Sequence, residues 1–459
     1  MILTRRDLRS TGLVAALSSG FGVALLQGAA VLVHVLGEYD VATHERMKVA
    51  LTVVAATFFA IAVFVGAIVT SNTVRTVIAG RTIDIARLRL LGAETRSIRR
   101  GFVRSGLFTA SISSTFGAAI VAAVGALTVL IAVNIGALPS KPYNLFSAQL
   151  LAPVIATIAV CAVAVLTGSR AVLGVAPVEA AGAAAVGLTE PRSRAPLGIV
   201  LIIVGIGCLV LGIVIGRETP WGLPVAVPGG MLSFGGVILC ADRFLPAVLR
   251  AVGSLFTMGA ATRLAAANAV REPGRSSRAV IGVVIGVTLI VMFSVAMETY
   301  YDVLFGAQSA FPDLYADSDS ALSFSIVVFS LLFGFSALIA AVGLVNTLSQ
   351  SVLQRRRELG LLRSIGLTGR QVRVMILTES MTMGVSAVIV GFALGIGYGW
   401  SGAMALLGSI PGGQFVVPVV PLWLLIAVPV ATVALCIGAA IMPTRRVLRG
   451  SPIAALAVA

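Results

Sequence analysis

Arginine is the residue type whose number and spacing give this sequence its binding chemistry. Lys and Arg total 33 against 18 Asp and Glu, and only Lys48 and Lys141 are lysines. Arginines concentrate in two segments, 81–99 and 355–373, and both segments place an acid and a glycine at matching positions. A segment rich in arginine presents a positively charged surface to lipid headgroups or to a binding partner, so both segments are candidate docking sites.

The residue types of enzyme active sites form no readable pattern. His34 and His44 stand apart from any Ser-His-Asp set, metal-ligand cluster or carboxylate pair. No G-x-x-x-x-G-K-[ST] motif occurs, so the chain carries no phosphate loop of this type. The cysteines lie in or beside apolar runs without a CxxC pair, which is typical of small buried side chains: Cys161, Cys208, Cys240 and Cys436. We therefore expect no catalytic site, metal or cofactor on this chain.

The segments between the arginine clusters are so apolar that they must lie in a membrane. Hydrophobic residues make up 58% of the chain, charged residues 11%, and the mean hydropathy is +1.05. About 20 apolar residues make one crossing. Ten segments qualify: 11–36, 49–70, 105–133, 148–167, 196–216, 221–240, 277–297, 322–348, 374–400 and 419–442. This pattern predicts an all-α polytopic membrane protein with about ten transmembrane helices. Nucleic acid is not an expected partner, because the positive charge sits between apolar runs.

The sixth segment is the weakest of the ten, because Pro224, Pro228, Gly229 and Gly230 would kink a lone helix. Charge supports its existence. All arginines except Arg46 and Arg217 fall on one side if ten crossings are assumed: in 1–10, 71–104, 168–195, 241–276, 349–373, 443–459 or at Arg278. The positive-inside rule then predicts that both termini are cytoplasmic. On the other side, the longest loop, 298–321, is acidic; a solvated loop is favoured over a cation, metal or partner site.

The arginine segments belong to an internal repeat, whose two copies align at one constant offset along the chain. The aligned pairs are Arg81 with Arg355, Asp84 with Glu358, Arg89 with Arg363, Gly92 with Gly366, Arg96 with Arg370, and Asn72 with Asn346. The repeat predicts two four-helix units, 1–182 and 263–459, joined by two extra helices in 183–262. Because two is an even number, the two units are expected to be parallel across the membrane.

Each unit is expected to carry a cytoplasmic amphipathic helix, over 81–100 and 355–373, broken near its glycine. Thr95 or Thr368 is the expected N-cap of the following helix. The apolar face is expected to lie in lipid, with the arginines toward headgroups or a partner. An interfacial anchor is the simpler interpretation of one copy, but two matched copies favour docking.

The run from Asn346 to Val372, N-T-L-x(8)-R-R-E-L-G-L-L-R-S-I-G-L-T-G-R-Q-V, followed by LTES at 377–380, resembles the signature of FtsX-like, MacB-type ABC transporter permeases. The resemblance covers about 320–455 well and 48–182 more loosely, and the ten-helix layout is similar to that of bacitracin-exporter-type permeases. It implies two parallel FtsX-like repeats in a bacterial cell membrane. It also implies a partner, a homodimer of a separate ATPase that holds ATP and Mg.

The resemblance places ATPase docking on the repeated residues Arg81, Asp84, Arg89, Gly92, Arg96, Arg355, Glu358, Arg363, Gly366 and Arg370. The first copy departs from the pattern at Asp84, Ala86 and Ser105, where the second copy has Glu358, Gly360 and Glu379. We therefore expect the two halves to contact the ATPase unequally, with tighter coupling in the second.

Three polar residues inside or beside apolar helices are candidates for coupling between helices. Glu379 is either a headgroup-level acid paired with an arginine or a latch between helices. Asn72 and Asn346 either join helices by side-chain hydrogen bonds or cap a helix end.

Two functions fit these features. The favoured one is an ABC permease that exports a hydrophobic or amphipathic compound, such as an antimicrobial agent, a peptide or a lipid, taken from the membrane by mechanical transmission. The alternative is a non-transporting relay that drives an outside partner such as a cell-wall hydrolase or a sensor. An ion-driven transporter is disfavoured, because the predicted helices are nearly free of charged residues near mid-membrane.

Overall fold

The computed structural model describes residues 5–35, 59–61, 63–68, 70–71, 74, 78, 82–135, 143, 145–174, 195–219, 221–256, 259, 262–265, 267, 273–310, 334, 366–408 and 416–449. These residues form helices and turns, and none of them lies in a strand. The α-helices are α1 (Arg5–Val35), α3 (Thr82–Leu90), α4 (Thr95–Asn134), α5 (Leu151–Gly168), α6 (Ala195–Gly216), α7 (Gly222–Gly253), α9 (Pro273–Ala310), α12 (Gly369–Leu407) and α13 (Leu422–Arg449). Three short 3-10 helices flank two of them: η2 (Ala148–Leu150) and η3 (Ser169–Gly174) lie at the two ends of α5, and η5 (Ser254–Phe256) follows α7.

Long apolar helices confirm the prediction of an all-α polytopic membrane protein. Within the described ranges, 6 helices are long and apolar enough to cross a membrane: Thr95–Asn134, Ala148–Gly168, Ala195–Gly216, Gly222–Phe256, Val280–Val303 and Gly369–Leu407. Shorter apolar helices occupy Gly12–Gly28, Phe59–Ile68 and Leu422–Gly438. Each of the ten predicted crossings therefore overlaps a described helix except 322–348, which lies outside the described residues apart from Gly334.

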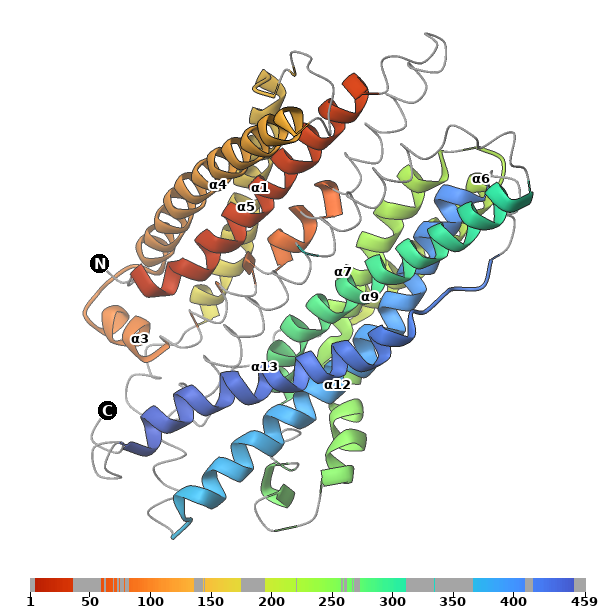
Figure 1. Cartoon of the computed structure of the whole chain (residues 1–459). Helices are drawn as coiled ribbons and strands as arrows, with labels where there is room; N and C mark the ends of the chain where they lie inside the picture. The colour runs from red at the N-terminus through yellow and green to blue at the C-terminus, as the bar shows by residue number, and fades with distance from the viewer. Residues whose placement is uncertain are drawn as a thin grey trace.

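The helices form an elongated bundle in which α1, α4 and α5 lie together on one side and α6, α7, α9 and α12 on the other (Figure 1). The largest buried cluster centres on α9, where Val280, Ile285 and Val291 have at most 1% of their surface exposed. Residues of α1, α7, α12 and α13 complete this cluster. The α9 helix is thus the central helix of the described part of the second unit.

The predicted weak crossing is a continuous helix, α7, although Pro228 and Pro246 lie within it. Its partner α6 approaches it through glycines. A Cβ added at Gly205 would lie 2.6 Å from the Gly229 carbonyl oxygen, and one added at Gly236 would lie 2.8 Å from an Ile202 side-chain carbon. Small residues that allow backbones to approach in this way are a main source of helix association in membranes. Close packing with α6 is therefore what supports α7.

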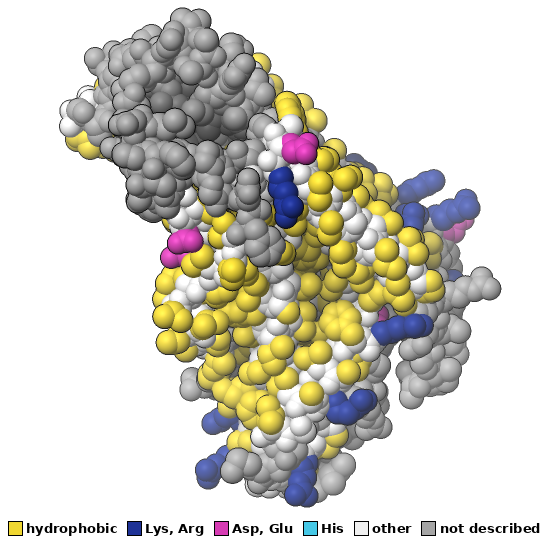
Figure 2. Space-filling model, turned by 90° about the vertical axis from the view of Figure 1, so that its right-hand side faces the viewer, with side chains coloured by type: hydrophobic (Ala, Val, Ile, Leu, Met, Phe, Trp, Pro, Cys, Tyr) yellow, Lys and Arg dark blue, Asp and Glu magenta, His cyan; other side chains and the backbone are white. Residues whose placement is uncertain are grey.

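The outer surface of the bundle is apolar, as a lipid-facing surface must be. Along α4, Phe108, Ile112, Phe116, Ile120 and Val124 recur every four residues and are each more than half exposed. A patch of this size on a water-soluble monomer would be unusual. Figure 2 shows hydrophobic side chains covering the middle of one face, with most of the visible Lys and Arg side chains toward its lower and right margins.

Candidate functional site

The first arginine segment contains a helix end closed by a glycine turn. After α3, the N–H of Gly92 donates to the Arg89 carbonyl at 3.1 Å, and the N–H of Ala93 donates to the Leu88 carbonyl at 2.9 Å. This pair of bonds is the Schellman arrangement, which requires a residue with positive φ just after the helix. Gly92 supplies it with φ of +91°. The helix predicted over 81–100 therefore breaks at its glycine, as expected.

The second segment enters α12 through a fully formed capping box. The Thr368 hydroxyl accepts a bond from the Gln371 N–H at 3.3 Å, and the Thr368 N–H donates to Gln371 Oε1 at 2.9 Å. Both bonds satisfy donors that a helix start otherwise leaves free. Thr368 is thus the N-cap, as predicted. In the first segment the N-cap is Glu94, whose side chain makes no capping bond, so the expectation of Thr95 is wrong by one residue.

The two turns have the same backbone geometry at matching positions of the repeat. Among the described residues, Gly92 and Gly366 are the two with positive φ, at +91° and +106°. The N-caps Glu94 and Thr368 have φ/ψ of −66°/135° and −69°/152°. Each N-cap carbonyl accepts a bond from the N–H four residues later, at 3.1 Å and 3.0 Å. We call residues 91–94 the first glycine turn and residues 366–368 the second.

Protein covers part of the apolar surface of α3. Ile85 and Ala86 are fully buried in a cluster with Ile98 and Phe102 of α4 and with Val172 of η3. The expectation of a helix with its apolar face in lipid is therefore wrong for Ile85 and Ala86. Helical spacing of apolar residues reports burial but does not say what buries them. The consequence is that the first glycine turn is fixed to the base of α4.

The surface that the two turns leave exposed combines cations with apolar side chains. Leu90 is 61% exposed and Leu91 is 84% exposed at the first turn. Arg96 and Arg370, which match each other in the repeat, are also exposed. A partner with carboxylates around an apolar patch would complement this surface.

Arg99 has a different role from its exposed neighbours. Its Nε–H donates to Ser169 Oγ at 3.2 Å, and its Nη2 donates to the Leu166 carbonyl at 3.2 Å. Both acceptors lie at the end of α5, where the last carbonyls of a helix lack intrahelical partners. Arg99 therefore clamps α4 to α5. Its spacing in the sequence gave no signal of this.

Each glycine turn leads directly into one very long helix. The α4 helix has 40 residues and α12 has 39. At 1.5 Å per residue each is about 60 Å long, roughly twice the hydrocarbon thickness of a bilayer. One continuous helix therefore joins each turn to the opposite end of the bundle.

The repeat extends into the packing of these helices. Gly117 of α4 and Gly391 of α12 are related by the same offset as the two turns, and each lies where its helix touches α1 or α9. A Cβ at Gly117 would lie 2.6 Å from Ala16 Cα, and one at Gly391 would lie 2.6 Å from Val287 Cγ1. The long helices of both units are thus held against their neighbours at equivalent positions.

Comparison with known families accounts for this duplication. The profile of the FtsX-like permease C-terminal domain matches residues 56–174 and again residues 330–452. The starts of the two matched regions are separated by the same offset as Gly92 and Gly366. The chain belongs to the FtsX-like permease family. As an FtsX-like permease with six long apolar helices in its described part, it is a multi-pass membrane protein.

Several curated proteins resemble short parts of this FtsX-like permease. It is 37% identical over 79 residues to the uncharacterized ABC transporter permease YknZ of Bacillus subtilis, which covers 17% of this chain and 19% of that protein. It is 38% identical over 61 residues to an uncharacterized ABC transporter permease of Methanocaldococcus jannaschii, covering 13% and 15%. It is 31% identical over 98 residues to the macrolide export ATP-binding/permease protein MacB of Bdellovibrio bacteriovorus, covering 19% and 15%. The matches therefore span less than a fifth of these relatives.

The structure locates part of the predicted site of this permease. Gly92 and Gly366 form the turns, Arg96 and Arg370 are exposed and Arg89 is half-buried. Asp84 lies within α3. Glu379 lies in α12 and is 5% exposed, so its carboxylate sits inside the protein, and its role in helix coupling stays a prediction. The remaining predicted residues lie outside the described ranges: Arg81, Arg355, Glu358, Arg363, Asn72 and Asn346. The exact boundaries of the two units also stay a prediction.

Proposed function

We propose that this chain is the permease subunit of an ABC transporter and that a separate ATPase dimer binds its two glycine turns. The matched geometry of the turns supports this proposal most directly. Two equivalent turns, each followed by an exposed arginine, suit a partner with two equivalent subunits. The turns would then lie on the cytoplasmic side of a bacterial cell membrane, where the positive-inside rule places their arginines, and both termini would share that side.

ATP and Mg would be held by the ATPase, and this chain would convert its closure into movement. The first turn is packed onto α4 through Ile85 and Ala86, and the second continues into α12 through the Thr368 capping box. Drawing the two ATPase subunits together would therefore displace α4 and α12 relative to each other. Because both helices are continuous, the displacement would reach the outer half of the bundle without passing through a flexible joint.

The compound moved would be hydrophobic or amphipathic and would enter from the membrane. The described lipid-facing surface is apolar along most of its length, as on α4 and α6. The relative from Bdellovibrio bacteriovorus is named as a macrolide exporter. Extraction of a membrane-dissolved antimicrobial agent, peptide or lipid is the activity that this surface suits best.

Charge reversal at the turns tests ATPase docking. The permease is expressed with the ATPase encoded beside it, purified through a tag on the permease, and assayed for bound ATPase and ATP hydrolysis. Arg96→Glu or Arg370→Glu should each weaken binding about tenfold, which corresponds to about 1.4 kcal/mol, and the double variant should abolish it. Arg250→Glu, an exposed arginine near the end of α7, is the matched control.

Two outcomes would reject the docking assignment. One is retention of the ATPase by the Arg96→Glu/Arg370→Glu double variant, and the other is an equal loss in Arg250→Glu. Asp84→Ala and Glu358→Ala then compare the two acids of the repeat. A larger loss of coupled hydrolysis from Glu358→Ala would support unequal coupling with the second half dominant.

A further inference from the structure

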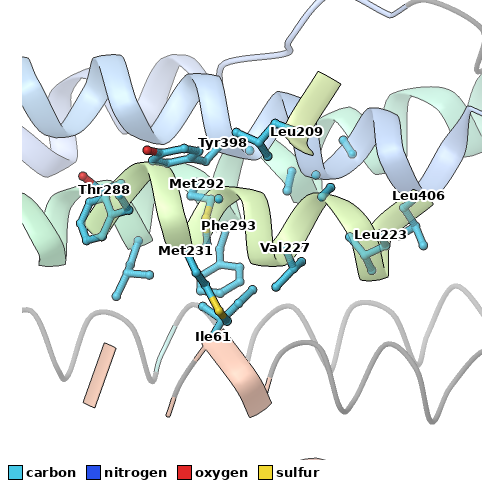
Figure 3. A pocket seen from close by; sticks show the side chains of 18 of the residues that line it. Ile61, Leu209, Leu223, Val227, Met231, Thr288, Met292, Phe293, Tyr398 and Leu406 are labelled. Carbon is cyan, nitrogen blue, oxygen red and sulfur yellow. The ribbon is translucent and has the colours of Figure 1, made fainter. Parts of the chain in front are cut away.

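An apolar cavity lies where the first unit, the linking helices and the second unit meet. Its described wall comes from the helical segment Phe59–Ile68, from α6 and α7, and from α9 and α12, and its volume is about 120 Å³. Figure 3 shows Met231, Met292 and Phe293 gathered at the centre of the wall, between Tyr398 and Ile61. The glycine turns and their arginines contribute nothing to its described wall.

The described wall of the cavity is mostly apolar. Of its described side chains, three carry polar atoms, and these are Thr288, Tyr300 and Tyr398. The Tyr398 hydroxyl already accepts a bond from Ser233 Oγ at 2.9 Å, and Thr288 Oγ1 is buried without a partner. The other described side chains of the wall are apolar, so the space favours an apolar group over a charged one.

Aromatic rings and thioethers form part of this wall, beside aliphatic side chains. Phe234 packs edge-on against Tyr398, with ring centroids 6.1 Å apart at 78°. Edge-to-face contacts and sulfur contacts with a ring both favour an aromatic guest over a saturated chain. The side chains that would supply such contacts are Phe64, Phe234, Phe293, Tyr398, Met231 and Met292.

The size of the cavity fits one ring. An engineered apolar cavity of about 150 Å³ in another protein binds benzene. At about 120 Å³ the present cavity has comparable room.

The cavity lies in the half of the bundle away from the glycine turns. Tyr398 lies roughly 45 Å along α12 from the N-cap Thr368, at the helical rise of about 1.5 Å per residue. Ala403 and Leu406, near the end of the same helix, also belong to the wall. A guest in this position is reached from the outer leaflet under the proposed orientation.

We propose that this cavity binds the aromatic ring of an amphipathic compound dissolved in the membrane. The part of this proposal that makes the cavity a substrate site rests on the proposed transport function, whereas the binding of an aromatic ring in the cavity does not. Because the wall joins segment Phe59–Ile68 of the first unit to α9 and α12 of the second, relative movement of the two units changes the shape of the cavity. Binding and release of the ring are thereby tied to that movement.

Photolabelling of the full-length permease in phosphatidylethanolamine and phosphatidylglycerol nanodiscs tests the proposal. One probe is a phenyl diazirine, and the other is a phosphatidylcholine with a diazirine on its acyl chain. Gly402→Leu fills the cavity, and Gly397→Leu is the matched control. Both glycines lie on α12 and have nothing within 4 Å of an added Cβ, but only Gly402 belongs to the described wall.

The phenyl probe should label wall residues such as Met231 and Met292 in the wild type and in Gly397→Leu. Labelling of these residues should fall about tenfold in Gly402→Leu. Unchanged labelling in Gly402→Leu overturns the site, and equal labelling of the wall by the acyl probe overturns the aromatic assignment. The assay uses neither ATP nor the ATPase, so a failure of the proposed transport function leaves its result intact.

Discussion

The contact between α6 and α7 predicts opposite effects for two alanine substitutions on the same helix, at Gly205 and Gly207. Gly205 faces α7, where an added Cβ would lie 2.6 Å from the Gly229 carbonyl oxygen and 2.7 Å from Ser233 Cβ. Gly207 faces away and has nothing within 4 Å. Gly205→Ala should therefore destabilise the hairpin, whereas Gly207→Ala should stabilise it.

The magnitude follows from two opposing contributions. Ordinary Cβ contacts begin at 3.4 Å, and the backbone nitrogen of Ser233 is closer still than the Gly229 oxygen, so Gly205→Ala forces the helices apart by about 1 Å. Overpacking of this kind costs about 1–3 kcal/mol. Replacing a helical glycine by alanine gains about 1 kcal/mol at either position. The two variants should consequently differ in free energy of unfolding by about 2 kcal/mol, with Gly205→Ala the less stable.

Equilibrium unfolding in mixed detergent and SDS micelles measures this difference. Trp221, which caps α7 beside the α6–α7 turn, is a fluorescent reporter in the hairpin itself. If the two alanine variants unfolded at the same SDS fraction, or if Gly207→Ala were the weaker, the described contact between α6 and α7 would be wrong.

Two further substitutions test the ends of the long helices. Thr368→Ala should lower the free energy of unfolding by about 1 kcal/mol, because the capping box is lost. Glu94→Ala should have almost no effect, because the Glu94 side chain makes no capping bond. Thermal unfolding of both variants measures the contrast, and equal shifts in the two would contradict it. Arg99→Ala should lower the free energy of unfolding by about 1–3 kcal/mol, because it removes both hydrogen bonds from α4 to the end of α5. The exposed Arg100 should tolerate alanine. Hydrogen exchange at the end of α5 should rise in Arg99→Ala alone, and unchanged exchange there would rule out the clamp.

Features set by local chemistry could be predicted from the sequence. The break at Gly92 and the N-cap Thr368 depend on a few neighbouring residues, and both were found where expected. The crossings follow from the length of the apolar runs. Even the weakest, α7, was recovered, because the distribution of arginines required it.

Features set by tertiary contacts could not be predicted. The repeat predicted an amphipathic helix in the region of α3, but whether lipid or protein covers its apolar residues depends on where α4 and η3 lie. The clamp made by Arg99 requires α5 to end beside it. The cavity needs helices from both units and the linker, and the Ser233–Tyr398 bond in its wall joins two side chains that are far apart in the chain.

The duplication on one chain has a consequence for symmetry. Two identical subunits related by a two-fold axis would present every off-axis feature twice. Here the halves are covalently joined and differ in sequence, so a feature present in one half need not recur in the other. The apolar cavity is lined by Phe59–Ile68 from the first half, by α9 and α12 from the second, and by the linking helices α6 and α7, which the repeat does not duplicate. Because the two halves differ in sequence, this space need have no counterpart on the other side of the pseudo-two-fold axis, whereas a pair of identical units would form two.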